Sequence, residues 1–445
     1  MYRYIRIIVV IFCSTVPVWA YADNATQPLS LERAITIALT NNPTFQTAGL
    51  AVARAEHRRK AAEADFLPKL GTSYTYTRLN EAPRIKAPAG SLYSEKINTV
   101  IGTQNSYQWD IHMIQPIFTG GQLYSIYKLE AFGVDVAKLQ HETARQELMY
   151  NVKAAYFNVL KAQKLRDVAR QAVAQIAAHE KTANDFFAQD MIAKNDLLEA
   201  QVRLAQAQQD LVRTEEALAL ARAVFNTVLH QDVNTDVEIL DVSDEQKLEL
   251  ALVDSQARAL QCQPVIQEID TRIKQAQTAV QLAQSTYFPK IFLVSSYLRQ
   301  GNQADLRGTP YKDPEAWHVS VNLDWTFWEW GRKQHIVGEQ NVKLLEAQEM
   351  RKEIVDKVML RVKDAWLRCE EHWKNIGVAR TAIARAEENF RIYENRFAQQ
   401  MATTTDVLDA QTLLTQAYSN YFAARYDYCI ARAALEYAIG ADLTK

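Results

Sequence analysis

Two segments of the chain carry pairs of carboxylates at the same short spacing. Residues 187–201 read FAQDMIAKNDLLEAQ and residues 397–411 read FAQQMATTTDVLDAQ. The pairs are Asp196 with Glu199, and Asp406 with Asp409. Side chains three residues apart lie on one face of a helix, so each pair would present its two carboxylates together. The alternative is that Asp406 caps a helix after the threonine run and that Asp409 is solvated.

Patterns typical of enzymes are absent from the sequence. It has no HExxH, CxxC, GxSxG or phosphate-loop motif. Cys262, Cys369 and Cys429 are widely spaced, which fits neither a metal site nor a disulfide framework. The 50 basic and 52 acidic residues provide no excess of positive charge for nucleic acid. We therefore predict no enzyme, no cofactor, no bound metal and no nucleic-acid partner.

The N-terminus is typical of an exported protein. Arg3 and Arg6 precede an apolar stretch over residues 7–18, and Ala20-Tyr21-Ala22 follows as a small-x-small site. This order predicts a secretory signal peptide over residues 1–22 rather than a membrane-spanning helix.

The mature sequence is a tandem repeat. Residues 66–69 correspond to 287–290 at an offset of 221, whereas residues 118–121 correspond to 328–331 at an offset of 210. The halves are therefore collinear apart from one segment that is shorter in the second copy. We predict a first repeat over 23–229, an equatorial connector over 230–262, a second repeat over 263–440 and a tail over 441–445.

Two periodicities alternate within each repeat. Alanine-rich seams with steps of three and four residues predict long coiled-coil helices over about 119–188, 193–229, 331–398 and 404–439. The seam turns polar at the acidic segments, which indicates a helical hairpin with its tip there in each half. Alternating apolar and polar residues predict strands over about 66–77, 105–117, 288–299 and 317–328.

The predicted strands have an aromatic, apolar face that suits an outer-membrane barrel. The aromatic residues expected in the membrane belt are Trp325, Trp328, Trp109, Tyr74 and Tyr76. Trp325, Trp328 and Trp330 form a cluster in the sequence, and the alternative to a place in the membrane belt is that they bind a ligand. Four strands are too few to close a barrel, since the smallest have about eight, so the barrel wall must be shared between chains.

The chain resembles the TolC family of outer-membrane efflux and secretion channels. The resemblance rests on LSLERAITIALTNNP (29–43), ADFLPKL (64–70), QPIFTGGQ (115–122) and the two acidic segments, in order and in register. It implies a mainly helical protomer with a transmembrane β-portion. Three protomers would form a 12-stranded β-barrel in the cell outer membrane on a 12-helix α-barrel that extends into the periplasm.

The resemblance also implies roles for the tips. Asp406 and Asp409 match the family's aspartate pair that narrows the periplasmic entrance, and Asp196 and Glu199 are their first-half counterparts. The helical tips, here Asp190, Met191, Gln400 and Met401, would contact a periplasmic adaptor that connects the duct to an inner-membrane transporter. The sequence departs from the family at the tips: Asp190 and Gln400 replace glycines, and Phe397 and Ala402 replace latch residues.

Two functions of different classes follow. The first is a trimeric outer-membrane exit duct of a tripartite efflux or type I secretion system, passing drugs, metal ions or proteins. The second is a periplasmic coiled-coil structural or adaptor protein whose strands form no transmembrane barrel.

Overall fold

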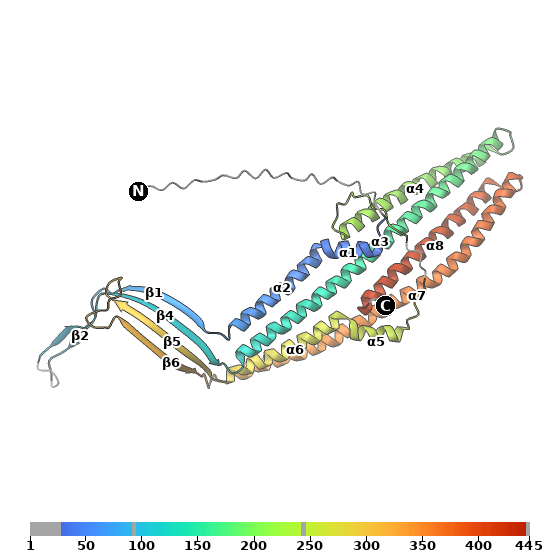
Figure 1. Cartoon of the computed structure of the whole chain (residues 1–445). Coiled ribbons are helices and arrows are strands. Elements are labelled where there is room, and N and C mark those ends of the chain that lie inside the picture. Colours follow the sequence, from blue (N-terminus) through green and yellow to red (C-terminus); the bar gives the residue numbers. More distant parts are fainter. Residues whose placement is uncertain (1–27, 91–94, 242–245, 442–445) are drawn as a thin grey trace, which may run out of the picture.

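The protein is elongated, with a β-sheet at one end and helical tips at the other (Figure 1). The computed structural model describes residues 28–90, 95–241 and 246–441. The predicted signal peptide and the last four residues of the predicted tail lie outside these ranges. None of the helices in the described ranges is both long and apolar enough to cross a membrane.

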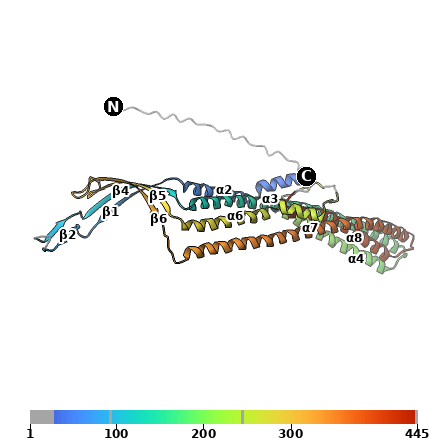
Figure 2. The ribbon, with the colours of Figure 1, turned by 90° about the horizontal axis from the view of Figure 1, so that it is seen from below.

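Two long helical hairpins make up most of the molecule. The first consists of α3 (Gln122–Phe187) and α4 (Lys194–Val228), and the second of α7 (Arg332–Ala398) and α8 (Thr404–Ile439). These bounds lie within three residues of the ranges expected from the heptad seams. In both views the two hairpins extend together away from the sheet (Figures 1 and 2).

The described ranges contain four further α-helices, α1 (Leu31–Asn41), α2 (Pro43–Ala64), α5 (Leu252–Cys262) and α6 (Pro264–Gln284), and a short 3-10 helix over Ser285–Tyr287. We had not predicted α2 and α6 as separate helices. Each begins with proline at its first position, where the missing N–H costs nothing. Helices α2 and α6 pack on α3, and α6 also packs on α7, so they extend the helical layer towards the sheet.

The repeat is visible in the backbone as well as in the sequence. Left-handed conformations recur 210 residues apart at the start of each long hairpin, at its tip and at its end. The equivalent positions are Gly120 and Trp330, Gly121 and Gly331, Asp190 and Gln400, and His230 and Gly440. Because so few residue types adopt this conformation readily, its recurrence shows that both halves turn in the same way.

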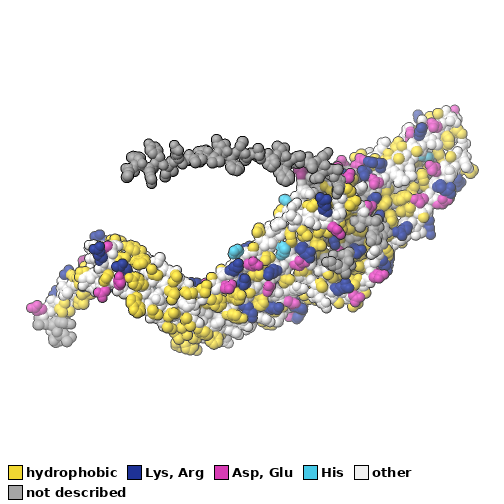
Figure 3. Space-filling view, viewed as in Figure 1, with side chains coloured by type: hydrophobic (Ala, Val, Ile, Leu, Met, Phe, Trp, Pro, Cys, Tyr) yellow, Lys and Arg dark blue, Asp and Glu magenta, His cyan; other side chains and the backbone are white. Residues whose placement is uncertain are grey.

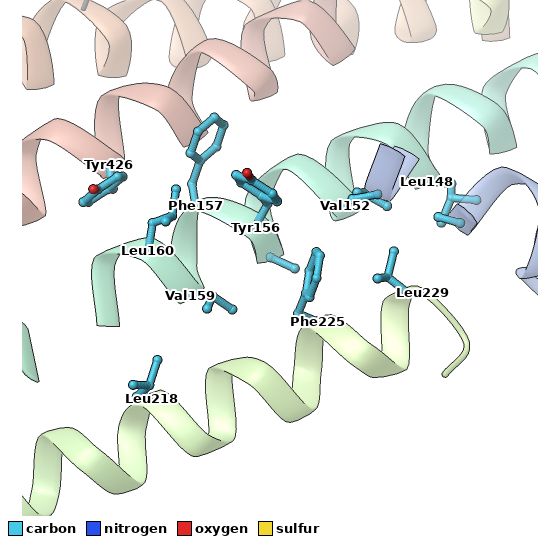
Figure 4. Packing of buried hydrophobic residues seen from close by; sticks show 13 residues of the cluster. Leu148, Val152, Tyr156, Phe157, Val159, Leu160, Leu218, Phe225, Leu229 and Tyr426 are labelled. Atoms are coloured by element: carbon cyan, nitrogen blue, oxygen red, sulfur yellow. The ribbon is translucent and has the colours of Figure 1, made fainter. Parts of the chain in front are cut away.

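The core is thickest midway along the long helices. Tyr156, Phe225 and Leu229 are fully buried between α3 and α4 (Figure 4). The Tyr156 hydroxyl donates to the carbonyl of Leu29 at 3.1 Å and to that of Leu240 at 2.5 Å. Leu29 also pairs with Ile239 in a parallel bridge. We name this region, where α1 and the connector cross the long helices, the equatorial girdle.

The sheet contains four antiparallel strands in the order β1-β4-β5-β6. They are β1 (Lys69–Arg78), β4 (Asn105–Phe118), β5 (Lys290–Gly301) and β6 (Glu315–Asp324). The prediction that the last strand reaches residue 328 is wrong. After Asp324 the chain leaves the sheet, the Trp325 indole donates to the Tyr287 carbonyl at 3.1 Å, and left-handed Trp330 and Gly331 lead into α7.

A second, two-stranded sheet projects beyond the first (Figure 1). It pairs β2 (Arg84–Ala87) with β3 (Ile97–Val100), in a stretch rich in glycine and proline for which we had predicted no strand. The prediction of only four strands is therefore wrong. Glycines and prolines flank two four-residue segments that are long enough to pair. The Arg84 guanidinium donates to the Asn98 side chain at 3.0 Å across the two strands.

Candidate functional site

The two helical tips share one turn. The amides of Asp190 and Met191 donate to the carbonyls of Phe187 and Phe186, and those of Gln400 and Met401 donate to Phe397 and Arg396. This pattern, with a left-handed residue after the helix, is a Schellman motif. Asp190 and Gln400 hold the left-handed position at φ of 53° and 60°. Both residues thus adopt the conformation that glycine adopts most readily, at the positions where the family resemblance implied glycine.

An apolar cluster joins the two tips to each other. Phe397 of α7 is only 4% exposed, and its ring lies 4.6 Å from the His179 ring and 5.5 Å from the Phe186 ring, both on α3. Leu197 of α4 and Val407 of α8 complete the contact from the other side. Phe397, which the resemblance placed at a latch position, is therefore buried and packs the hairpins together.

Asp406 caps α8. Its carboxylate accepts from the amide and the hydroxyl of Thr403 at 2.9 and 2.8 Å, and its own amide donates to the Thr403 hydroxyl at 3.2 Å. This reciprocal pair is a capping box. The hydrogen bond from the Thr403 backbone lowers the pKa of Asp406 below its usual value. Within one chain Asp406 thus has the capping role that we gave as the alternative, while its place in a ring of neighbouring chains stays a prediction.

The other three acidic residues differ in their surroundings. Asp409 is exposed on α8, one turn after Asp406. Glu199 accepts from the Thr405 hydroxyl at 3.0 and 3.2 Å, which connects α4 to the start of α8. Asp196 is half-buried and accepts from the side chain of Asn195 at 3.3 Å. The structure therefore brings Glu199 close to the start of α8, and the gate role of all four remains a prediction.

Sequence reasoning missed the polar contacts that join α3 and α4 to α8 above the tips. Arg203 donates to the Thr412 hydroxyl at 2.7 Å, and Gln411 donates to Gln175 at 2.8 Å. The partners are 209 and 236 residues apart, and no periodicity signals such pairs. The four predicted adaptor-contact residues are all exposed: Asp190, Met191, Gln400 and Met401. Within the described ranges, no cluster of three or more His, Cys, Asp or Glu side chains could hold a metal ion.

At the opposite end, the sheet has one apolar and one polar face. The strand register aligns Tyr74 with Trp109, and aligns Tyr297 with both Ile111 and Trp317. On β6 the residues of this face are highly exposed: Trp317, Val319, Val321 and Leu323 are 57–75% accessible. Hydrophobic side chains gather over this sheet in the space-filling view (Figure 3). Such a surface requires an apolar environment or a partner.

The predicted belt aromatics lie in different environments. Tyr74, Tyr76 and Trp325 are exposed, whereas Trp109 is half-buried and its indole donates to the Thr72 hydroxyl at 3.0 Å. Trp328 is exposed but lies beyond the end of β6, with its ring 5.7 Å from that of Trp330. All five lie in or beside the sheet, and their contact with lipid remains a prediction.

Comparison with known proteins agrees with this architecture. The family model described as "Outer membrane efflux protein" matches residues 34–228 and 257–441, which is most of the chain and one match per half. The chain belongs to this family. Its members are outer-membrane channels, which confirms the predicted location in the outer membrane and the prediction that the chain is not an enzyme.

Individual relatives share the fold at low sequence identity. Outer membrane protein TolC of Escherichia coli is 22% identical over 410 residues, covering 86% of this chain and 79% of TolC. The Campylobacter jejuni CmeC outer membrane channel superposes with a TM-score of 0.78 at 15% identity, covering 92% of this chain and 85% of CmeC. The outer membrane protein VceC of Vibrio cholerae gives 0.77 at 15%, covering 92% and 96%.

Family membership decides between the two predicted functions. The TolC-like efflux channel is confirmed at this level, and the periplasmic adaptor without a membrane-spanning part is not supported. The protein is an outer-membrane efflux channel of the TolC type.

Proposed function

We propose that three copies of the chain close into one exit duct. The four-stranded sheet has β1 and β6 as its edges, and four strands are fewer than the roughly eight that the smallest barrels need. Pairing β6 of one copy with β1 of the next gives a wall of 12 strands from three chains. The apolar face would then contact lipid, and the polar face would line the channel.

The helical part supports the same closure. In the tip half, α3 packs between α4 and α8, and α8 packs on α7, so α4 and α7 are the outer members of the layer. Both outer helices carry apolar side chains that are 42–70% exposed: Leu198, Val202, Val212, Leu220 and Val224 on α4, and Leu360, Leu367, Val378 and Ile392 on α7. Two different surfaces that fit each other generate a ring when the rotation closes.

The closed ring would have its narrow entrance at the tips. Each chain would contribute Asp406, Asp409, Asp196 and Glu199 to that entrance, and a ring of carboxylates favours cations. The exposed tips would contact a periplasmic adaptor, which couples the duct to an inner-membrane transporter. The cargo would be the small molecules of an efflux system or the proteins of a type I secretion system.

The proposal rests on one observation. The sheet and the helical layer each have two outer elements without a neighbour on one side, β1 and β6 in the sheet and α4 and α7 in the helical layer. The first test of the proposal is the mass of the detergent-purified protein, together with its migration with and without heating. A mass near three times that of one mature chain, with heat-modifiable migration, supports the duct. A monodisperse monomer that forms no channels in a planar bilayer would contradict it.

The acidic entrance needs a test that separates charge from capping. Asp406→Gln removes the charge but retains a side chain that completes a capping box. Combined with Asp409→Asn, it should raise the single-channel conductance and reduce the preference for cations. Asp254→Asn removes an exposed carboxylate in α5, away from the tips, and serves as the control. Equal conductance in the wild-type protein, the double variant and the control would mean that Asp406 only caps α8 and that Asp409 is only solvated.

A further inference from the structure

The polar face of the sheet carries two histidines at the same level. The register aligns Gly71 of β1 with His112 of β4, His112 with Ser296 of β5, and Ser296 with His318 of β6. Residues directly opposite one another across a sheet point to the same face. His112 and His318 therefore lie on one level of the polar face, near the middle of the sheet.

His112 is held in place by its neighbours. Its Nδ1 lies 2.7 Å from the Asp110 carboxylate, which also accepts from the Ser73 hydroxyl. A Cβ added to Gly71 would lie 2.5 Å from His112 Nε2, so the imidazole occupies the space that the glycine leaves free. The His112 side chain still keeps 39% of its surface exposed. It is thus oriented by the sheet and open to solvent on the polar face.

The remaining charges on this face are few. Lys290 is aligned with Asp324, and Lys69 is bonded to Asp65 at 2.8 Å. Asp110 is the other acidic residue among the strand positions of the polar face. The ion pair between Arg299 and Glu315, at 3.6 Å, lies on the apolar face. At the strand positions of this face two lysines balance two carboxylates, and protonating both histidines would add two positive charges per chain.

We propose that His112 and His318 give the exit barrel a positive charge on acidification, which opposes the cation preference of the acidic entrance. The proposal rests on the proposed duct, in which this face lines the channel. Histidine is the side chain that changes charge between about pH 5 and about pH 8. Three chains would then carry a band with no net charge in a neutral medium and, with two protonated histidines per chain, a charge of about +6 in an acidic one. A band of fixed charge selects ions of the opposite sign.

The test is the reversal potential of single channels under a KCl gradient, measured from about pH 8 to about pH 5. The wild-type protein should prefer potassium at the upper end, with a potassium-to-chloride permeability ratio that falls several-fold on acidification. His112→Gln combined with His318→Gln should keep the cation preference over this range. His57→Gln, an exposed residue of α2, should behave as wild type.

A further variant guards against damage to the sheet. His318 is exposed at the edge strand, and His318→Lys should give a permanent positive charge and therefore a weaker cation preference even at the upper end of the pH range. A pH response that persists in the double glutamine variant, or a wild-type permeability ratio that does not change, would overturn the inference. No channel activity in any of the proteins would instead overturn the proposed duct.

Discussion

Replacing Phe397 with alanine should loosen the two tips while the rest of the protein stays folded. The ring is 4% exposed and packs from α7 against α3, where it contacts His179 and Phe186. Truncation of a buried phenylalanine to alanine costs about 3–5 kcal/mol. We expect the lower value, about 3 kcal/mol, because hairpin ends can partly collapse into the space.

Local opening should report this loss directly. Since about 1.4 kcal/mol corresponds to a tenfold change in an equilibrium constant, amides protected by tip closure should exchange about 100-fold faster. Hydrogen exchange with mass spectrometry would compare peptides over 183–200 and 393–410 with peptides around Tyr156 in the girdle. Met401→Ala removes a side chain that is 59% exposed and should change little.

Two results would refute this reasoning. Unchanged protection at the tips would mean that the Phe397 ring contributes nothing to holding the hairpins together. Equal loss of protection around Tyr156 would mean that the tips and the girdle open as one unit, since local opening energies are then shared.

Three other perturbations have defined outcomes. Gln400→Gly and Asp190→Gly should each stabilise the tip against local opening by about 0.5 kcal/mol. The reason is that relief of about 1–2 kcal/mol of left-handed backbone strain exceeds the entropy that glycine adds to the unfolded chain. Faster hydrogen exchange at the tip would contradict this. Thr403→Ala should cost about 1 kcal/mol at the start of α8, whereas Asp406→Gln should cost less, as measured by exchange of the first turn. Burial lowers the pKa of His179 to about 4. As the pH falls, this histidine therefore takes up a proton in the unfolded tip before it does so in the folded tip, and the stability of the tip should decrease as the pH drops from about 6.5 to about 4. His179→Leu should weaken that dependence in limited proteolysis across this range, and an identical profile would exclude His179 as its source.

Much of the fold could be predicted from the sequence because two strong periodicities alternate without interruption. The heptad seams located α3, α4, α7 and α8, since nothing in those stretches competes with helix. The hairpin tips were found from polar seam residues, and the left-handed conformation of Gln400 shows why a single helix could not continue there. Where apolar and polar residues alternate over ten positions, as in β6, the strand itself was clear.

The rest depended on contacts that leave no local signal. The end of β6 could not be predicted, because Trp325 and Phe327 continue the alternation although the chain has already turned towards α7. Strands β2 and β3 are four residues each, too short to stand out between glycines and prolines. The contact between Thr405 and Glu199 joins residues 206 positions apart. For Asp406, spacing allowed both a cap and a gate, and one chain can display only the first.

The girdle has a mechanical consequence for the long helices. Helix α3 contains 66 residues without a break, which is about 100 Å at about 1.5 Å per residue. From Tyr156, held in the girdle, to Phe187 at the tip is an arm of about 46 Å. A tilt of about 10° with the girdle as fulcrum would carry the tip sideways by about 8 Å. Because α3 has no break, a small rotation about the girdle would move the tip and the sheet end of this helix, about 51 Å from Tyr156, in opposite directions.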